Sequence, residues 1–144
     1  MYYLNAKGKE LVGSEKNEVK WNQQVDHILM RNDIWLFYYG PKDWKVEVPL
    51  TITSGLSQVA VVPDAIFTLE GKYYFVEIDN TQKMTKNKDK IDYYARINPL
   101  VLKQFNHAPV IVFYTANPTR KEKLKELCQA KGLDCRIYTK EDLV

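Results

Sequence analysis

Residues 61 to 80, VVPDAIFTLEGKYYFVEIDN, constrain the fold more than any other part of the chain. Two runs rich in β-branched and aromatic residues flank Glu70-Gly71. Such a pattern predicts two antiparallel strands joined by a two-residue turn. In the register that this turn sets, Asp64 faces Glu77 across the strand pair. The hairpin therefore places these two acids in an apolar segment, where acidic residues are uncommon.

A third acid belongs to the same group. Asp79 follows Glu77 by two residues, and side chains two apart on a strand point to the same face. Directly opposed residues have Cβ atoms about 4.5–5.5 Å apart, so Asp64 and Glu77 would repel each other. A divalent cation, a shared proton or a basic side chain could offset this repulsion. Oxygen ligands of this kind suit Mg²⁺ or Mn²⁺, and pairing of the acids with lysines is the structural alternative.

The whole chain has the size and composition of one globular domain. It has 144 residues, of which 45% are hydrophobic and 27% are charged. No apolar run reaches the roughly 18 residues of a membrane span, and the first residues lack the apolar stretch of a signal peptide. We therefore expect a cytoplasmic protein with no membrane segment. Cys128 and Cys135 lack a paired metal spacing and are expected to be reduced thiols.

The basic charge is concentrated after the acidic hairpin. The net charge is +3, but residues 83 to 96 alone carry five basic residues and two acids. Lys83, Lys86 and Lys90 follow the i, i+3, i+7 spacing of one helix face, and Tyr93 continues it. This face could contact the phosphates of a nucleic acid, or it could be an ordinary solvated basic face.

The remaining pattern predicts alternating helices and strands. Caps and breakers define the helices: Asn32-Asp33 would end the first, Thr81 and Pro99 would bound the second, and Asn117, Pro118 and Gly132 would bound the third. The expected helices span 14–33, 81–99 and 117–132. The expected strands span 34–40, 44–52, both arms of the hairpin within 61–79, 108–116 and 134–139, with a terminal turn or frayed helix over 140–144. The order predicts an α/β fold with a mixed central sheet and helices on both faces.

The acidic hairpin and the helix after it resemble the PD-(D/E)xK nuclease superfamily, whose core is restriction-endonuclease-like. The resemblance rests on Pro63-Asp64, on Glu77-Ile78-Asp79 and on the Lys- and Tyr-bearing helix that follows. It implies that Asp64, Glu77 and Asp79 hold Mg²⁺ or Mn²⁺, with Asp79 as a ligand or a water-orienting base. It also implies that Lys83 or Lys86 contacts the phosphate. This sequence departs from the superfamily pattern because Asp79 stands where the lysine is usual.

A closer resemblance is to the replication-relaxation family of plasmids and mobile elements. It rests on residues 2–13, which resemble a final winged-helix strand, on residues 25–35 and on residues 62–79, and it covers about residues 1–97. It implies that residues 1–13 are a remnant of a winged-helix wing and that residues 14–144 form a nuclease-like domain. It further implies DNA, and plasmid replication or mobilisation proteins, as partners.

The sequence is compatible with three functions. The first is a metal-dependent DNA endonuclease or nickase, and the second is a catalytically silent domain of the same fold that binds DNA or a replication protein. The third is a protein-interaction domain in which the acids form salt bridges. The acid at Asp79 favours the second function over the first, whereas the opposed carboxylates favour the first over the third. Asp26 and His27 could add a metal ligand or position a water, although a local hydrogen bond of His27 is the simpler interpretation.

Overall fold

A computed structural model describes residues 14–80 and 82–144 of the chain. The predicted wing remnant (residues 1–13) and the predicted cap Thr81 lie outside the described residues. The elements are α2 (Ser14–Phe37), β1 (Lys45–Val46), β2 (Leu50–Ser54), β3 (Ser57–Val61), β4 (Ala65–Leu69), β5 (Lys72–Asp79), α3 (Met84–Phe105), β6 (Val110–Thr115), α4 (Pro118–Ala130), β7 (Cys135–Tyr138) and the 3₁₀ turn η1 (Lys140–Leu143).

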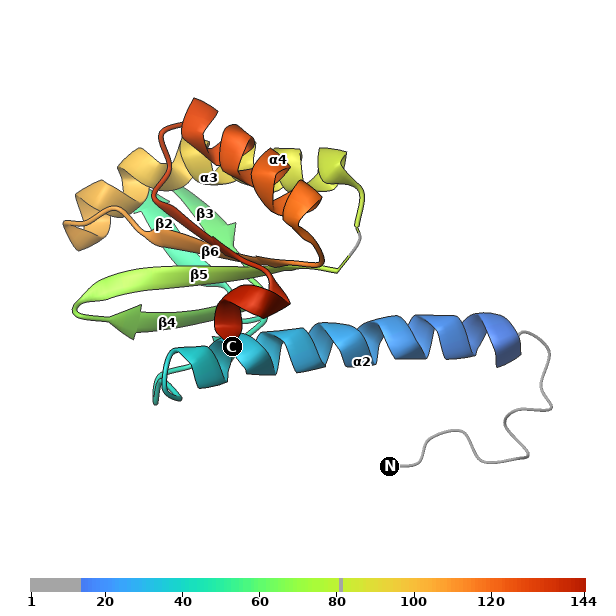
Figure 1. Cartoon of the computed structure of the whole chain (residues 1–144). Helices are drawn as coiled ribbons and strands as arrows, with labels where there is room; N and C mark the ends of the chain where they lie inside the picture. The colour runs from blue at the N-terminus through green and yellow to red at the C-terminus, as the bar shows by residue number, and fades with distance from the viewer. Residues whose placement is uncertain (1–13, 81) are drawn as a thin grey trace.

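A five-stranded mixed sheet in the order β1-β4-β5-β6-β7 organises the domain. The pairs β1–β4 and β4–β5 are antiparallel, whereas β5–β6 and β6–β7 are parallel. The strands β2 and β3 form a separate antiparallel pair. The α2 helix covers one face of the large sheet, and α3 and α4 lie on the other side (Figure 1). The predicted α/β class, with a mixed sheet and helices on both faces, is confirmed.

The hairpin register matches the prediction. Leu69 pairs with Lys72 across the turn, and the ladder extends to Ala65 and Val76. Glu70 adopts φ +53° and Gly71 φ +79°, which is the left-handed backbone that the favoured two-residue hairpin turns require. Asp64 lies one residue before the ladder, at the same level of the sheet as Glu77.

Both faces of the hairpin are buried, as the sequence predicts. On the side of α3 and α4, Ile66 and Phe75 join a large apolar core. On the α2 side, Phe67 and Tyr74 join a second core that also contains Ile34. Each fully buried apolar side chain of this size contributes about 1.5–3 kcal/mol of stability. Because both faces are covered, polar groups can reach solvent only at the strand ends, and the predicted acids lie at such an end.

The predicted boundaries of α4 are confirmed at its N-terminus. Asn117 caps the helix by accepting a hydrogen bond from the Arg120 amide at 2.9 Å, and Pro118 occupies the first turn. At the other end the C-cap is Lys131, and Gly132 follows it with φ +67°. Gly132, the predicted cap, therefore lies one position beyond the observed cap, where a left-handed glycine is common.

The prediction of a strand over residues 34–40 is wrong. The α2 helix does not end at Asn32-Asp33 but continues to Phe37. Ile34 and the following Tyr38 lie one turn apart and both pack into the core on the α2 side. This tertiary packing outweighs the strand propensity of the apolar run.

The limits predicted for the second helix are also wrong. The α3 helix begins at Met84 after the cap residue Lys83, and it continues through Pro99 to Phe105. Val101, beyond the proline, is fully buried in the core, and this burial offsets the lost backbone hydrogen bond. The helix ends at Asn106, which adopts the left-handed conformation with φ +63°.

The region predicted as one strand over residues 44–52 is divided between two sheets. β1 pairs with β4, whereas β2 pairs with β3, a strand that is absent from the predicted elements. Glu47, in the connection, has φ +53° and accepts a hydrogen bond from Arg31 at 3.0 Å. The β2–β3 pair packs against α3 through Ile52 and Val61.

Candidate functional site

Glu77 is a deeply buried carboxylate that forms an ion pair with a lysine. It lies near the carboxyl end of β5 with only 1% of its surface exposed. Lys90 donates to Oε1 at 2.5 Å, and the Tyr94 hydroxyl donates to Oε2. Lys90 and Tyr94 are one turn apart on α3, so the helix presents both donors to the strand. Both carboxylate oxygens are therefore hydrogen-bonded, as burial of a charged group requires.

Burial controls the titration of Glu77. It raises the pKa of this carboxyl to about 7, although the Lys90 ammonium and the Tyr94 hydroxyl act in the opposite direction. The negative charge of Asp64 raises the pKa further. Burial would lower the pKa of Lys90, but the charge and hydrogen bond of Glu77 raise it above its ordinary value. Glu77 can therefore exchange a proton near neutral pH beside a permanently charged lysine.

Asp64 lies between this pair and α2. Its Oδ2 accepts a hydrogen bond from the Ile78 amide at 2.7 Å, and its Oδ1 is 3.5 Å from Nε2 of His27. Burial would raise the pKa of Asp64, but His27, the Ile78 amide and Lys90 together lower it. Asp64 and Glu77 thus share one electrostatic environment, with Lys90 acting on both.

Asp79 takes part in a different cluster, although it lies two residues beyond Glu77 on the same strand. Arg120 binds it with both ends of its guanidinium group, Nε to Oδ2 at 2.8 Å and Nη2 to Oδ1 at 2.8 Å. Thr115 also donates to Oδ2 at 2.6 Å. Burial would raise the pKa of Asp79, but these hydrogen bonds lower it. The carboxylate joins β5 to β6 and α4, and its oxygens are occupied by protein donors.

The predicted basic face separates into two parts. Lys83 and Lys86 are exposed at the N-terminal end of α3, and neither is ion-paired to a described carboxylate. Lys90 is turned inward to Glu77, and the Tyr93 hydroxyl donates to the backbone oxygen of Ala60 at 2.6 Å. The structure therefore brings Asp64, Glu77 and Lys90 together and leaves Lys83 and Lys86 apart from them.

Whether this site can bind a divalent cation depends on how many of its oxygen ligands are grouped together and free of other partners. Within residues 14–80 and 82–144, no group of three or more His, Cys, Asp or Glu side chains is arranged to hold a metal ion. Asp79 is engaged by Arg120, and the position beside Glu77 is taken by the Lys90 ammonium. The predicted set of three carboxylates does not fit a common metal centre in this arrangement.

Two members of these clusters were not singled out from the sequence. Tyr94 is four residues after Lys90, and that spacing alone would have placed it on the same helix face. Arg120 is 41 residues from Asp79, and it reaches the acid only because β5 and β6 are parallel neighbours. No local signal in the sequence indicates that contact.

The fold and site define a mixed α/β domain with a buried acid–lysine pair at the carboxyl end of a central strand. The chain belongs to the replication-relaxation family, whose model matches residues 1–108. Membership links it to replication and relaxation, and so to DNA or mobile-element machinery. A search of curated proteins finds no match. Among the described residues, no helix is long and apolar enough to cross a membrane.

Proposed function

We propose that this domain binds DNA for a replication-relaxation protein, as a module whose acidic cluster is structural and whose basic helical layer contacts phosphates. The observation that carries the proposal is the segregation of charge. The helices α3 and α4, with their caps Lys83 and Lys131, contain eleven Lys and Arg but only four Asp and Glu. These two helices lie on one side of the sheet, opposite α2 (Figure 1).

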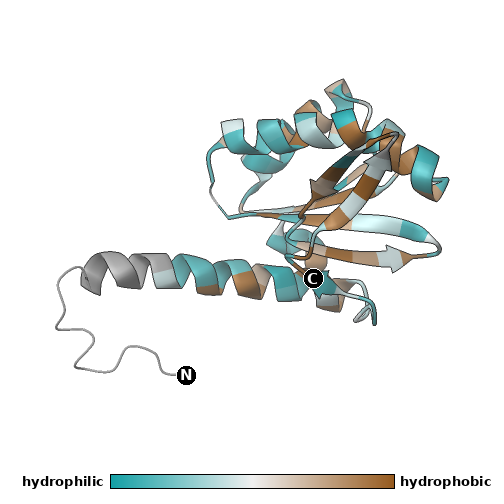
Figure 2. Cartoon of the chain, turned by 180° about the vertical axis from the view of Figure 1, so that it is seen from behind, coloured by the Kyte–Doolittle hydropathy of each residue, from teal (hydrophilic) through white to brown (hydrophobic). Residues whose placement is uncertain are grey.

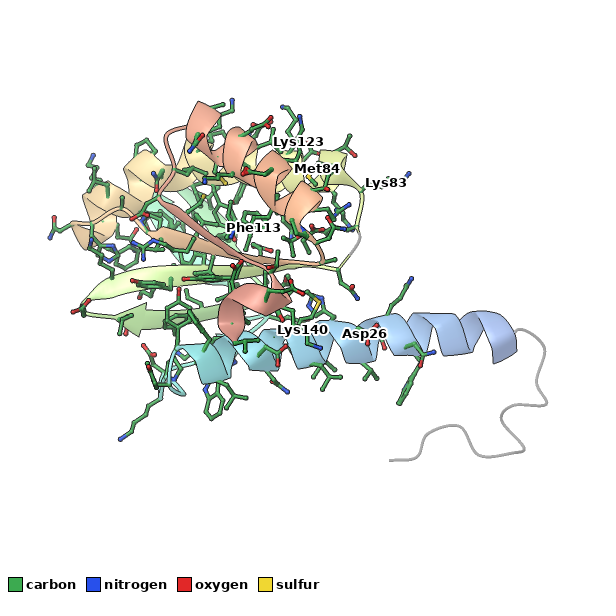
Figure 3. All side chains as sticks on the ribbon, viewed as in Figure 1. Asp26, Lys83, Met84, Phe113, Lys123 and Lys140 are labelled. Carbon is green, nitrogen blue, oxygen red and sulfur yellow. The ribbon has the colours of Figure 1, made fainter. Side chains whose placement is uncertain are left out.

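Some of these cations are already paired with acids, and others are available to a ligand. Lys88 and Lys131 both contact Asp92, and Lys121 contacts Asp142. A second group of cations is exposed and forms no ion pair with a carboxylate of the described residues. These cations are Lys83, Lys86, Lys123 and Lys125. Figure 3 places Lys83 and Lys123 on the α3–α4 layer, away from Asp26 on α2. Exposed cations gathered on one layer suit a polyanion, because each phosphate contact releases condensed counterions.

Removing Lys83, Lys86 and Lys123 together should weaken DNA binding and reduce its salt dependence. If all three contact phosphates of a duplex, the slope of log K against log salt should fall by about 2.7, at about 0.9 per contact. The measurement is fluorescence anisotropy with a labelled duplex over a series of salt concentrations. Lys90 is left unchanged in this variant because it is held by Glu77.

A matched control removes the same charge from another surface. Lys42, Lys45 and Lys72 are also exposed but lie in or beside β1 and β5. Their combined replacement by Ala should leave the salt slope unchanged and should lower affinity only through net charge. Equal slope changes in the two triple variants would show that the α3–α4 layer is not the contact surface.

A second candidate function, a Mg²⁺- or Mn²⁺-dependent nuclease, is favoured by one observation. Asp64 and Glu77 lie at the same end of the β4–β5 hairpin, together with Lys90. Two acids and a lysine are the residue types that the nuclease resemblance requires. A metal bound by these two acids would have to displace the Lys90 ammonium from Glu77. The two candidates therefore differ in whether Lys90 permanently supplies the positive charge of the site.

Mn²⁺ should leave the melting temperature of the parent protein unchanged if Lys90 supplies that charge. Lys90→Ala removes this competing cation, so Mn²⁺ should then raise the melting temperature of the variant by mass action. Thermal unfolding with and without millimolar Mn²⁺ measures both effects, and Lys86→Ala is the control on the same helix. A rise in the parent that Asp64→Asn abolishes, together with cleavage of plasmid DNA, would instead establish the nuclease.

A further inference from the structure

The β2–β3 hairpin has an apolar inner face and a polar outer face. On the inner face, Ile52 and Val61 are buried in the core that α3 covers. The outer face consists of exposed side chains, those of Thr51, Thr53, Gln58 and Ala60. The ladder places each threonine directly opposite one of the other two residues, so the four side chains form one patch. Figure 2 shows brown, apolar segments alternating with paler ones along the strands.

The hairpin is uncharged, which is unusual for exposed strands. Residues 49–63 contain no Asp, Glu, Lys, Arg or His, although 27% of the whole chain is charged. Both strands are edges of a two-stranded sheet, and exposed edges are usually protected by charged side chains. Leu56 in the turn is fully exposed as well. The outer face therefore offers hydroxyl, amide and methyl groups to a partner without any charge of its own.

The α3 helix holds the hairpin in place through one hydrogen bond to each strand. Gln104 Oε1 accepts a hydrogen bond from the Thr53 amide at 2.8 Å, and the Tyr93 hydroxyl donates to the Ala60 carbonyl at 2.6 Å. Both bonds use the main chain of the hairpin, so the outward side chains of Thr53 and Ala60 take no part in them. The outer face is therefore presented on a fixed backbone, as a recognition surface requires.

Cations of α3 border the hairpin. Arg96 lies over the ring of Tyr93, 5.1 Å from its centroid, and Lys103 directly precedes Gln104. Lys86 is two turns before Tyr93 on the same side of the helix. These three cations are exposed, and none forms an ion pair in the described part of the chain. A neutral face bordered by positive charge complements a duplex groove, in which phosphates border neutral base edges.

The residue types of the outer face are those that contact A·T base pairs. A glutamine amide binds both N6 and N7 of adenine, and threonine or alanine methyl groups pack on the thymine methyl. The major groove, about 12 Å wide, admits a two-stranded ribbon. We propose that the β2–β3 hairpin lies in the major groove of DNA and reads A·T pairs, with Gln58 on adenine and Thr53 on thymine. The inference rests on the proposed DNA contact and adds to it the element that reads the bases.

Base preference tests the hairpin separately from the phosphate contact. The full chain is used to select duplexes from a random-sequence pool, and its affinities for a selected and a G·C-only duplex are compared by fluorescence anisotropy. The selection should enrich A·T pairs. Gln58→Ala should reduce the preference about tenfold and leave the salt slope unchanged, because no phosphate contact is lost. Gln129→Ala removes an exposed amide from α4 and should change neither quantity.

Modified bases test the same contacts without depending on the stability of one variant. Replacing adenine by its 7-deaza analogue removes the N7 acceptor, and replacing thymine by uracil removes the methyl group. The first change should weaken binding of the parent about tenfold and should not affect Gln58→Ala. The second should weaken the parent more than Thr53→Ser, which keeps the hydroxyl but has no methyl group.

The outcomes separate this inference from the proposed function. A parent that binds A·T and G·C duplexes equally, or a Gln58→Ala variant that keeps the full preference, would overturn the reading by the hairpin while the salt-dependent phosphate contact stands. Equal sensitivity of the parent and Gln58→Ala to the deaza base would also overturn it. A parent that binds no duplex would overturn both the hairpin assignment and the proposed function.

Discussion

Replacing Arg120 by Ala should lower the free energy of unfolding by about 3 kcal/mol, because it leaves the Asp79 carboxylate buried without its counter-charge. Asp79 is 0% exposed, and Arg120 contacts both of its oxygens at 2.8 Å. Thr115 retains its hydrogen bond to the acid in the variant, so the loss should fall at the lower end of the range for broken buried pairs. Urea unfolding followed by circular dichroism measures the difference.

Two companion variants make the result specific. Arg120→Lys keeps the charge but cannot donate from two ends at once, so its loss should be intermediate. Lys123→Ala removes an exposed cation from the same helix and should change stability by no more than about 0.5 kcal/mol. If Arg120→Ala behaves like Lys123→Ala, then Asp79 does not depend on Arg120, and a ligand role for Asp79 becomes open again.

The acidic hairpin could be predicted from the sequence because its signals are local. Glu70-Gly71 sets the turn, and the turn sets the register of every residue that precedes and follows it. The position of Asp64 opposite Glu77 can therefore be predicted from the sequence alone. The alternation of strands and helices after the hairpin likewise predicts the parallel pairing of β5 with β6.

The partition of the three acids could not be predicted in the same way. Glu77 and Asp79 point to one face of β5, as expected, but the face is covered by different helices at the two positions. Lys90 on α3 reaches Glu77, while Arg120 on α4 reaches Asp79. The crossing of α3 and α4 over the sheet decides which acid each cation meets. That crossing is a tertiary property, and nothing in the local sequence around the acids encodes it.

The first helix shows the opposite failure, in which local signals mislead. Residues 34–40 are apolar and aromatic, and Asn32-Asp33 precedes them as an apparent stop. In the fold, Asp33 accepts a hydrogen bond from the Tyr114 hydroxyl at 3.1 Å and remains inside the helix. Its polar side chain therefore serves a tertiary contact and does not end the helix.

Stability should decrease by about 2–3 kcal/mol between pH 5 and pH 8 because of Glu77. The pKa of this carboxyl is raised from 4.5 to about 7, and burial is the main cause. The folded state therefore binds a proton more tightly than the unfolded chain in this window. A raised carboxyl pKa gives stability that is complete below the unfolded value and is lost as the pH rises through the folded value. Urea unfolding at half-unit steps of pH measures the profile.

Glu77→Gln should flatten this decrease, because the amide has no proton to lose. The comparison depends on the slope with pH, so a constant cost of leaving Lys90 beside a neutral partner does not affect it. Glu126→Gln removes an exposed carboxylate from α4 and should give a profile parallel to that of the parent. An equally steep decrease in Glu77→Gln would assign the titration to another group. A parent that becomes more stable between pH 5 and pH 8 would mean that the attraction of Lys90 outweighs the burial of Glu77, and the pair would then act as a stabilising salt bridge.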